Sequence, residues 1–324
     1  MRRDGYVTAA KKKGPWRSGF CGHDLPPESH ARCHGVYINR PCVCDCHQEK
    51  PVLTAHDDSK QGFHDNIPEA AYHADRESLS VSGAKVLLKA PALFKWQQDH
   101  PVHKDVFDIG SAAHRLVLGV GPDVLVCPFD SWRTNEAKAM RDDARQRGEI
   151  PVLKADWERV TEMADVLSRH RMAMSLLSGG KAEVSAYALD EETGVMRRCR
   201  YDYLRDDLAV DYKSAASSEP TAFARAAASF GYHMQHPYYY DIGIDLGLPL
   251  KGFVFIVQMK EPPYLVSVVE LVPDAVERGR DLNRQALQRF RDCREVDLWQ
   301  GYARDDEITP IDIPRWAYYD QESA

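Results

Sequence analysis

The chain has 324 residues, 44% of them hydrophobic, which is enough to bury one large core or two modest ones. Its formal net charge is −7, although residues 1–50 hold more Lys and Arg than Asp and Glu, and this balance argues against a protein that coats nucleic acid through its overall charge. No stretch approaches the ~18 to 20 consecutive apolar residues of a membrane span, and the first residues lack the apolar core of a secretory signal, so we expect a cytoplasmic protein without membrane contacts.

Residues 1–50 are rich in cysteine and histidine and show no apolar periodicity. Cysteines clustered among histidines, in a chain without an export signal, indicate metal ligands rather than disulfides. We therefore predict a Cys/His-rich segment that binds a structural Zn²⁺; its ligands would be Cys21, Cys33, Cys42 and Cys46, with His30, Cys44 or His47 as substitutes. A partly oxidised, disordered tail is the alternative, and the basic residues of this segment could contact DNA or a protein.

The next part of the chain is polar and contains Gly62 and Pro68, which favour turns and irregular structure. This pattern predicts three further regions: a linker over residues 51–77, a main domain over residues 78–302 and a C-terminal tail over residues 303–324.

The main domain begins with helical patterns. Ser80 or Ser82 can cap a first helix, and Pro91 can open the second. The helix that follows has an apolar face and carries His114. This third helix is expected over residues 108–118, and two further helices are expected over residues 134–147 and 154–177.

From Ala182 the hydrophobic period changes to that of strands. An antiparallel meander is expected over residues 182–190, 196–204 and 208–214, with short turns between its strands. Helical patterning returns over residues 220–245, two strands follow at 252–260 and 264–271, and a long helix at 273–293 closes the domain. This order predicts an α/β domain with a mixed central sheet flanked by helices.

Two acidic residues and a lysine are expected to meet on this meander. Asp211 and Lys213 are two residues apart, so their side chains leave the same face of a strand. Asp202 lies on the preceding strand and could be brought beside Asp211 by hairpin pairing. Paired carboxylates supply the oxygen ligands that Mg²⁺ prefers, and an adjacent ammonium could neutralise developing phosphate charge. The alternative is a solvent-facing Asp211–Lys213 ion pair.

Five segments of the chain, in this order, resemble the PD-(D/E)XK nucleases, and within them the branch of the RecE exonuclease (exodeoxyribonuclease VIII) and the RecB nuclease domain. They are GSAAH ending at His114, AEVS with Glu183, RYDYL with Asp202, VDYKS with Asp211 and Lys213, and YHMQHPYYY with Gln235 and Tyr239. Asp211 stands where many members of the superfamily have Glu, and no Pro precedes Asp202; the Asp-x-Lys form is typical of the RecE branch.

The resemblance implies the PD-(D/E)XK restriction-endonuclease-like core and cleavage of phosphodiester bonds with one or two Mg²⁺ or Mn²⁺ ions. It assigns metal binding to Asp202, Asp211, the backbone carbonyl of Tyr212 and His114, and activation of the attacking water to Lys213. Glu183 would be a supporting carboxylate. Gln235 and Tyr239 would face the same groove and contact DNA or buttress the site, although His114, Gln235 and Tyr239 are also compatible with ordinary helix packing.

The same resemblance implies a function on DNA ends. RecE-like enzymes of phages and prophages degrade one strand of linear double-stranded DNA from its 5′ end, in the host cytoplasm, and leave a 3′ single strand for a single-strand annealing protein of RecT type. They form ring-shaped homo-oligomers. Two alternatives remain: a restriction-like or repair endonuclease of the same superfamily, and a noncatalytic DNA-binding or assembly protein.

Overall fold

The computed structural model describes residues 36–37, 40–41, 60–100 and 105–318, and the chain divides into two units, residues 1–56 and residues 57–324. In the first unit, β1 (Val36–Tyr37) pairs antiparallel with β2 (Arg40–Pro41). The cysteines that we predict to bind zinc, Cys21, Cys33, Cys42 and Cys46, lie outside the described residues, so zinc binding remains a prediction.

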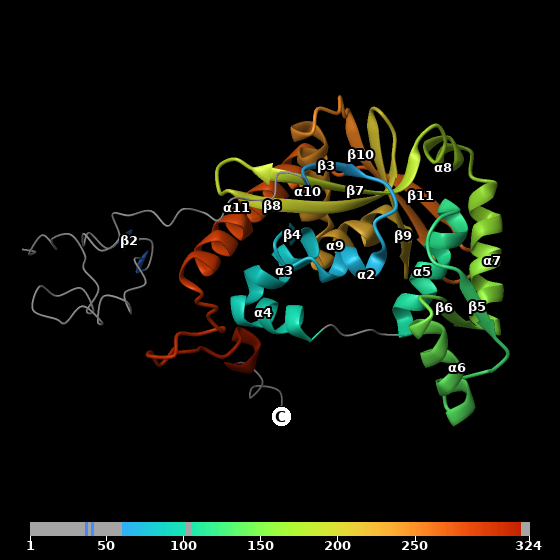
Figure 1. Cartoon of the computed structure of the whole chain (residues 1–324), viewed down its shortest axis with the longest axis horizontal. Helices are drawn as coiled ribbons and strands as arrows, with labels where there is room; N and C mark the ends of the chain where they lie inside the picture. Colours follow the sequence, from blue (N-terminus) through green and yellow to red (C-terminus); the bar gives the residue numbers. More distant parts are fainter. Residues whose placement is uncertain (1–35, 38–39, 42–59, 101–104, 319–324) are drawn as a thin grey trace, which may run out of the picture. The chain divides into compact units, whose positions relative to one another are not determined.

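A seven-stranded sheet forms the centre of the second unit (Figure 1). Six strands lie in the order β11-β10-β9-β8-β7-β3, and a further short strand, β4, pairs in parallel with β8. Their bounds are β3 (Gly62–His64), β4 (Leu79–Ser80), β7 (Lys181–Asp190), β8 (Val195–Leu204), β9 (Leu208–Ala215), β10 (Gly252–Met259) and β11 (Val266–Val269). β9 and β10 are parallel, whereas β7, β8 and β9 form an antiparallel meander. The expected mixed α/β fold is therefore confirmed.

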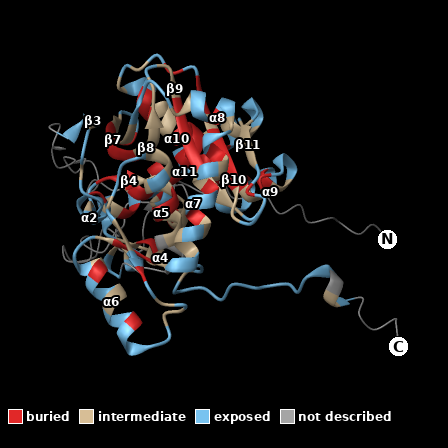
Figure 2. Ribbon diagram, turned by 90° about the vertical axis from the view of Figure 1, so that its right-hand side faces the viewer, coloured by how far each residue is buried: buried red, intermediate tan, exposed pale blue. Residues whose placement is uncertain are grey.

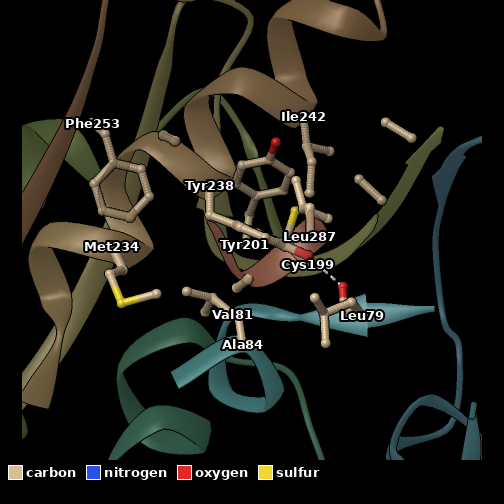
Figure 3. Packing of buried hydrophobic residues seen from close by; sticks show 14 of the residues in the cluster. Leu79, Val81, Ala84, Cys199, Tyr201, Met234, Tyr238, Ile242, Phe253 and Leu287 are labelled. Carbon is tan, nitrogen blue, oxygen red and sulfur yellow. Dashed lines mark hydrogen bonds between the residues drawn. The ribbon is translucent and has the colours of Figure 1, made fainter. Parts of the chain in front are cut away.

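One face of the sheet carries the larger hydrophobic core. The helices that contribute to it are α3 (Val81–Lys89), α4 (Pro91–Asp99), α9 (Pro220–Phe230), α10 (Tyr232–Asp245) and α11 (Pro273–Val296). Figure 3 shows Tyr238 and Ile242 of α10 packed beside Tyr201 of β8 and Leu287 of α11. The Tyr238 hydroxyl donates a hydrogen bond to the backbone carbonyl of Leu79, which ties α10 to β4, directly before α3.

A second core lies on the opposite face of β9 and β10, where Val210, Tyr212 and Ile256 are buried. It is closed by α5 (Asp105–Leu118), α7 (Lys154–Ser168), α8 (Arg171–Leu176) and the small parallel sheet of β5 (Val124–Cys127) and β6 (Ile150–Leu153). The helix between those two strands, α6 (Asn135–Gln146), is largely exposed (Figure 2). Among the helices of the described ranges, none combines the length and the apolar character that a bilayer span requires.

Two expected elements are each divided in the structure. The helix expected over residues 154–177 is α7 followed by α8, because the ring of His170 accepts a hydrogen bond from the Ala173 N–H and caps a new helix. The helical pattern expected over residues 220–245 forms two helices, α9 and α10, because Gly231 between them adopts a left-handed conformation with φ +69°. The cap at Ser80 and the start of α4 at Pro91 agree with the sequence patterns, whereas the cap that Thr134 forms on α6 was not predicted.

Residues expected to form a linker also contribute secondary structure. β3 pairs antiparallel with β7, and α2 (Glu69–Ala74) places the buried Tyr72 beneath Arg198 and Arg200 of β8. Both elements are too short to show a period and are stabilised by tertiary contacts. At the other end of the unit, a 3-10 turn, η3 (Arg315–Tyr318), is the last element of the described ranges.

Gly279 allows a close crossing of α11 over the start of α10. A Cβ atom at this position would lie 1.6 Å from the backbone carbonyl oxygen of His233, so Gly279→Ala must push the two helices apart. We expect this substitution to lower the free energy of unfolding by about 3 kcal/mol, although alanine favours helix by about 1 kcal/mol over glycine. Gly110→Ala, where an added Cβ meets nothing within 4 Å, is the matched control and should be neutral or stabilising in denaturant unfolding. Equal stability of the two variants would contradict the close crossing.

Candidate active site

The site forms where β8 and β9 separate. These strands pair at Tyr203↔Val210 and Leu204↔Ala209, next to their connecting turn. Just beyond, Asp202 Oδ2 accepts a hydrogen bond from the backbone N–H of Tyr212 at 2.8 Å, so a side chain replaces the next contact of the ladder. The carboxylate of Asp202 is therefore held at the fork between the two strands.

Two irregularities in the adjoining strands orient the acidic residues at this fork. Between β7 and β8 the register passes from Ala182↔Tyr203 to Val184↔Tyr201 without a Glu183–Asp202 pair. Glu183 has a positive φ of 54°, which is unfavourable for a residue other than glycine. Tyr201 packs in the first core and Tyr203 in the second, so the alternation of β8 shifts at Asp202, although the register with β7 is the same on both sides. Backbone strain of this kind is typical of functional sites.

His114, Glu183 and Asp202 form a potential metal-binding group. One ligand atom from each lies within 4.8 Å of the others, and His114 Nδ1 is 3.6 Å from Asp202 Oδ2. The His114 ring also meets the Tyr212 ring edge-on at 5.3 Å, which positions α5 over the fork. Two carboxylates and one imidazole, all only partly buried, are ligands that Mn²⁺ and Mg²⁺ accept.

Asp211 and Lys213 form an ion pair next to this group, on the face of β9 that α10 covers. Lys213 Nζ is 2.7 Å from Asp211 Oδ2, and the two side chains are 20% and 2% exposed. Gln235 Nε2 of α10 donates a hydrogen bond to Asp211 Oδ1 at 2.6 Å. The alternative of a solvent-facing pair is therefore wrong, and both oxygens of Asp211 have polar neighbours within the protein.

The charges of the site interact. Burial is the main cause that raises the pKa of Asp211 to about 6; within this value the Lys213 ammonium lowers the pKa, and the negative charge of Asp202 raises it. Burial also raises the pKa of Glu183 to about 7, with a second contribution from repulsion by Asp202. Burial alone would lower the pKa of Lys213, but the charges of Asp211 and Asp202 outweigh it and raise that pKa. The carboxyl groups are thus close enough to disfavour one another's ionisation, which a bound cation would relieve.

Most of the residues that we predicted for the site lie close together in the structure, where they form two subsets. His114, Glu183 and Asp202 are the potential metal-binding group, whereas Asp211 is held by Lys213 and Gln235 beside it. The metal-ligand roles of Asp211 and of the Tyr212 carbonyl remain predictions.

Tyr239 is partly buried and packs against other aromatic rings. Its ring meets those of Tyr201 and Phe253 edge-on, at 5.5 and 5.8 Å. Burial raises its pKa well above the ordinary value, with smaller contributions that include the charges of Asp211 and Asp202. The position favours a buttressing role.

Three residues near the site were not singled out from the sequence. Arg200 lies 4.0 Å from Glu183 and donates hydrogen bonds to Ser185 Oγ and to the carbonyl of Ile67. Lys85 and Tyr232 approach the Asp211–Lys213 pair from α3 and α10. Their sequence signals were weak: Arg200 belongs to a run of arginines on a strand, Lys85 is one of two lysines on a largely apolar helix, and Tyr232 is the first residue of the YHMQHPYYY segment.

Metal binding at this site is expected to release protons. In the metal-free protein Glu183, with a pKa of about 7, is largely protonated at pH 6, and a metal ligand must be ionised. The affinity for Mn²⁺ should therefore rise between about pH 6 and about pH 8. Because the pKa of Glu183 is raised from 4.5 on folding, the metal-free protein should also lose stability as the pH rises from about 4.5 to about 7.

Calorimetric titration with Mn²⁺ in two buffers of different ionisation enthalpy measures the number of protons released. Glu183→Gln should reduce this number and flatten the pH dependence of the melting temperature. Unchanged proton release in that variant would show that Glu183 is not the residue that ionises.

Comparison with known proteins identifies a family and a solved structure with a similar fold. Residues 80–308 match the family described as "PDDEXK-like domain of unknown function (DUF3799)". The crystal structure of a "putative exonuclease" from Eubacterium rectale is 14% identical, with a TM-score of 0.52, and the match covers 81% of this chain and 100% of that chain. At this identity the likeness shows a shared fold alone. No curated protein matches the chain.

The family match includes the helix with His114, the three strands with Glu183, Asp202, Asp211 and Lys213, and the helix with Gln235. The family and the geometry of the site therefore agree: the chain belongs to the PDDEXK-like family DUF3799, within the PD-(D/E)XK nuclease superfamily.

Proposed function

We propose that the protein is a Mg²⁺- or Mn²⁺-dependent exonuclease that degrades linear double-stranded DNA. One observation carries this proposal: a buried Asp–Lys pair lies at the fork of two strands, beside a group of one histidine and two carboxylates with the spacing of metal ligands. A protein that bound DNA without cleaving it would have no need to bury these charges together, at a cost in desolvation.

Each side chain has a distinct task in the proposed reaction. A divalent ion, when bound, would activate a water molecule as the nucleophile and would stabilise negative charge on the scissile phosphate. Asp202, Glu183 and His114, whose ligand atoms lie within 4.8 Å of one another, would bind this ion. Lys213 presents an ammonium to the attacking water or to the phosphate oxygens, and Asp211, fixed by Gln235, orients that ammonium and adds negative charge next to the ion.

The direction of digestion and the partners follow from the resemblance to RecE-type enzymes. On this basis the protein removes nucleotides from the 5′ end, leaves 3′ single strands for an annealing protein of RecT type, and works as a homo-oligomer. The naming of the Eubacterium rectale protein as an exonuclease also favours activity on DNA ends.

Digestion of linear and covalently closed circular duplexes, with Mg²⁺ or with a chelator, tests the proposal. We expect loss of the linear duplex only, and only with Mg²⁺; labels on the 5′ or the 3′ ends report the direction. Asp202→Asn controls for contaminating nucleases. Cleavage of the closed circle would favour the endonuclease alternative, whereas two intact substrates would favour the noncatalytic one.

A further inference from the structure

A second lysine approaches the Asp211–Lys213 pair from another helix. Lys85 belongs to α3, and its Nζ lies 5.7 Å from the centroid of the Tyr232 ring. Lys213 Nζ lies 5.1 Å from the centroid of the same ring. Two ammonium groups, from elements far apart in the sequence, therefore share one aromatic ring beside the candidate active site.

The junction of α9 and α10 fixes the side chain of Lys85. Gly231 stands at this junction, and a Cβ atom there would lie 2.9 Å from Lys85 Cε and 3.0 Å from Lys85 Cδ. The aliphatic part of Lys85 thus packs directly against the glycine backbone. This packing leaves the ammonium at the end of a stem that has little freedom to move away from Lys213.

Lys85 lacks the neutralising partner that such a position normally requires. It is half-buried, and among the described residues no carboxylate forms an ion pair with it. Burial, followed by repulsion from Lys213, lowers the pKa of Lys85 to about 8, and the charge of Asp211 offsets only part of this. Lys89, one turn further along α3, is exposed, as lysines usually are. The surroundings of Lys85 therefore favour an anion that the folded chain does not itself supply.

We propose that Lys85 and Lys213 bind a phosphate group of the DNA between them, over the Tyr232 ring, and that Lys85 is the residue dedicated to this contact. The inference rests on the proposed function, because the anion that a nuclease must place next to its acidic residues is a phosphate. A lysine ammonium binds phosphate as a compact point charge. Two such charges would offset the repulsion that Asp211 and Asp202 exert on a phosphate. The phosphate is either internal to the strand or the terminal one.

The test compares Lys85→Met with Lys89→Met, which removes the same charge from the exposed end of the helix. DNA binding is measured without divalent ions over a range of salt concentrations, and kcat and KM are measured with Mg²⁺ on linear duplexes with 5′-phosphate or 5′-hydroxyl ends. Lys85→Met should weaken binding roughly tenfold and reduce the slope of log affinity against log salt by about 0.9, the amount expected for one phosphate contact. Lys89→Met should change neither, and Lys85→Arg should restore the salt slope.

The two sources of phosphate give different kinetics. If the phosphate is terminal, the native protein prefers phosphorylated ends and Lys85→Met loses that preference; if it is internal, the variant raises KM equally on both duplexes. A structural role would instead lower the melting temperature, whereas removing an unpaired, half-buried charge should preserve or raise it. If Lys85→Met bound DNA with the same affinity and the same salt slope as the native protein, the proposal would be overturned. Because binding is measured without divalent ions, it tests Lys85 even if the native protein cleaves no DNA, a result that would overturn only the nuclease function.

Discussion

Asp202→Asn is expected to lower the rate of DNA cleavage by at least ~10³-fold, equivalent to about 4 kcal/mol of transition-state stabilisation. The reason is geometric: Asp202 is the residue that connects the potential metal-binding group to the β8–β9 fork, through His114 on one side and the Tyr212 N–H on the other. Asparagine keeps an oxygen that can accept the Tyr212 hydrogen bond, so the fork should persist. What it removes is the negative charge that holds a divalent cation.

Single-turnover cleavage of end-labelled duplex at saturating Mg²⁺ measures this loss, and binding of the same duplex in a chelator provides the comparison. We expect DNA affinity to stay within about threefold or to rise, because a carboxylate that repels phosphate is gone. Asp190→Asn, at the far end of β7, is a suitable control of the same chemistry. If Asp202→Asn cleaved at the native rate, the assignment of the metal-binding group would be wrong.

Lys213→Met is expected to reduce cleavage by roughly 10² to 10³-fold, the loss typical when a positioned electrostatic donor is removed. It should also destabilise the fold, because Asp211 is only 2% exposed and would lose the cation that offsets its burial. The sign of the pH dependence follows from the Asp211 pKa of about 6, which would rise further without the ammonium. Protonated Asp211 needs no cation, so the stability deficit should be largest above about pH 7 and should shrink below about pH 6.

Chemical denaturation at several pH values measures that deficit. Lys251→Met is the matched control, since Lys251 also pairs with an aspartate, Asp207, but at 3.4 Å and with both side chains largely exposed. That variant should differ from the native protein by less than ~0.5 kcal/mol at every pH. A deficit of equal size in the two variants would contradict the view that burial makes the Asp211–Lys213 pair important.

Local sequence patterns were sufficient for much of the fold. Ser80 caps α3 through the Gly83 N–H, and the meander of β7, β8 and β9 follows the alternation of its apolar residues. The same two-residue period placed Asp211 and Lys213 on one face. Period and capping depend on neighbours in the chain, and the sequence displays those neighbours directly.

The features that could not be predicted depend on contacts between distant residues. The shift of β8 at Asp202 is visible only when Tyr201 and Tyr203 are seen in different cores, and the positive φ of Glu183 has no signal in the AEVS segment. The sequence also did not show that the acidic residues divide into a potential metal-binding group and an aspartate paired with Lys213, because this division depends on the positions of the side chains in space. Lys85 could not be identified from the sequence for the same reason, since the residues that it contacts, Gly231 and Tyr232, lie far from it in the chain.

The residues just before Ser78 matter for any attempt to isolate the catalytic region. A chain shortened to begin there would keep His114, Glu183 and the residues after them, yet it would lose β3 and with it the partner that covers the outer edge of β7. Unprotected strand edges recruit other chains, so such a fragment should aggregate even though its hydrophobic cores are complete. The same cut would remove the Ile67 carbonyl that holds Arg200 near Glu183, so that any soluble fraction should bind metal more weakly.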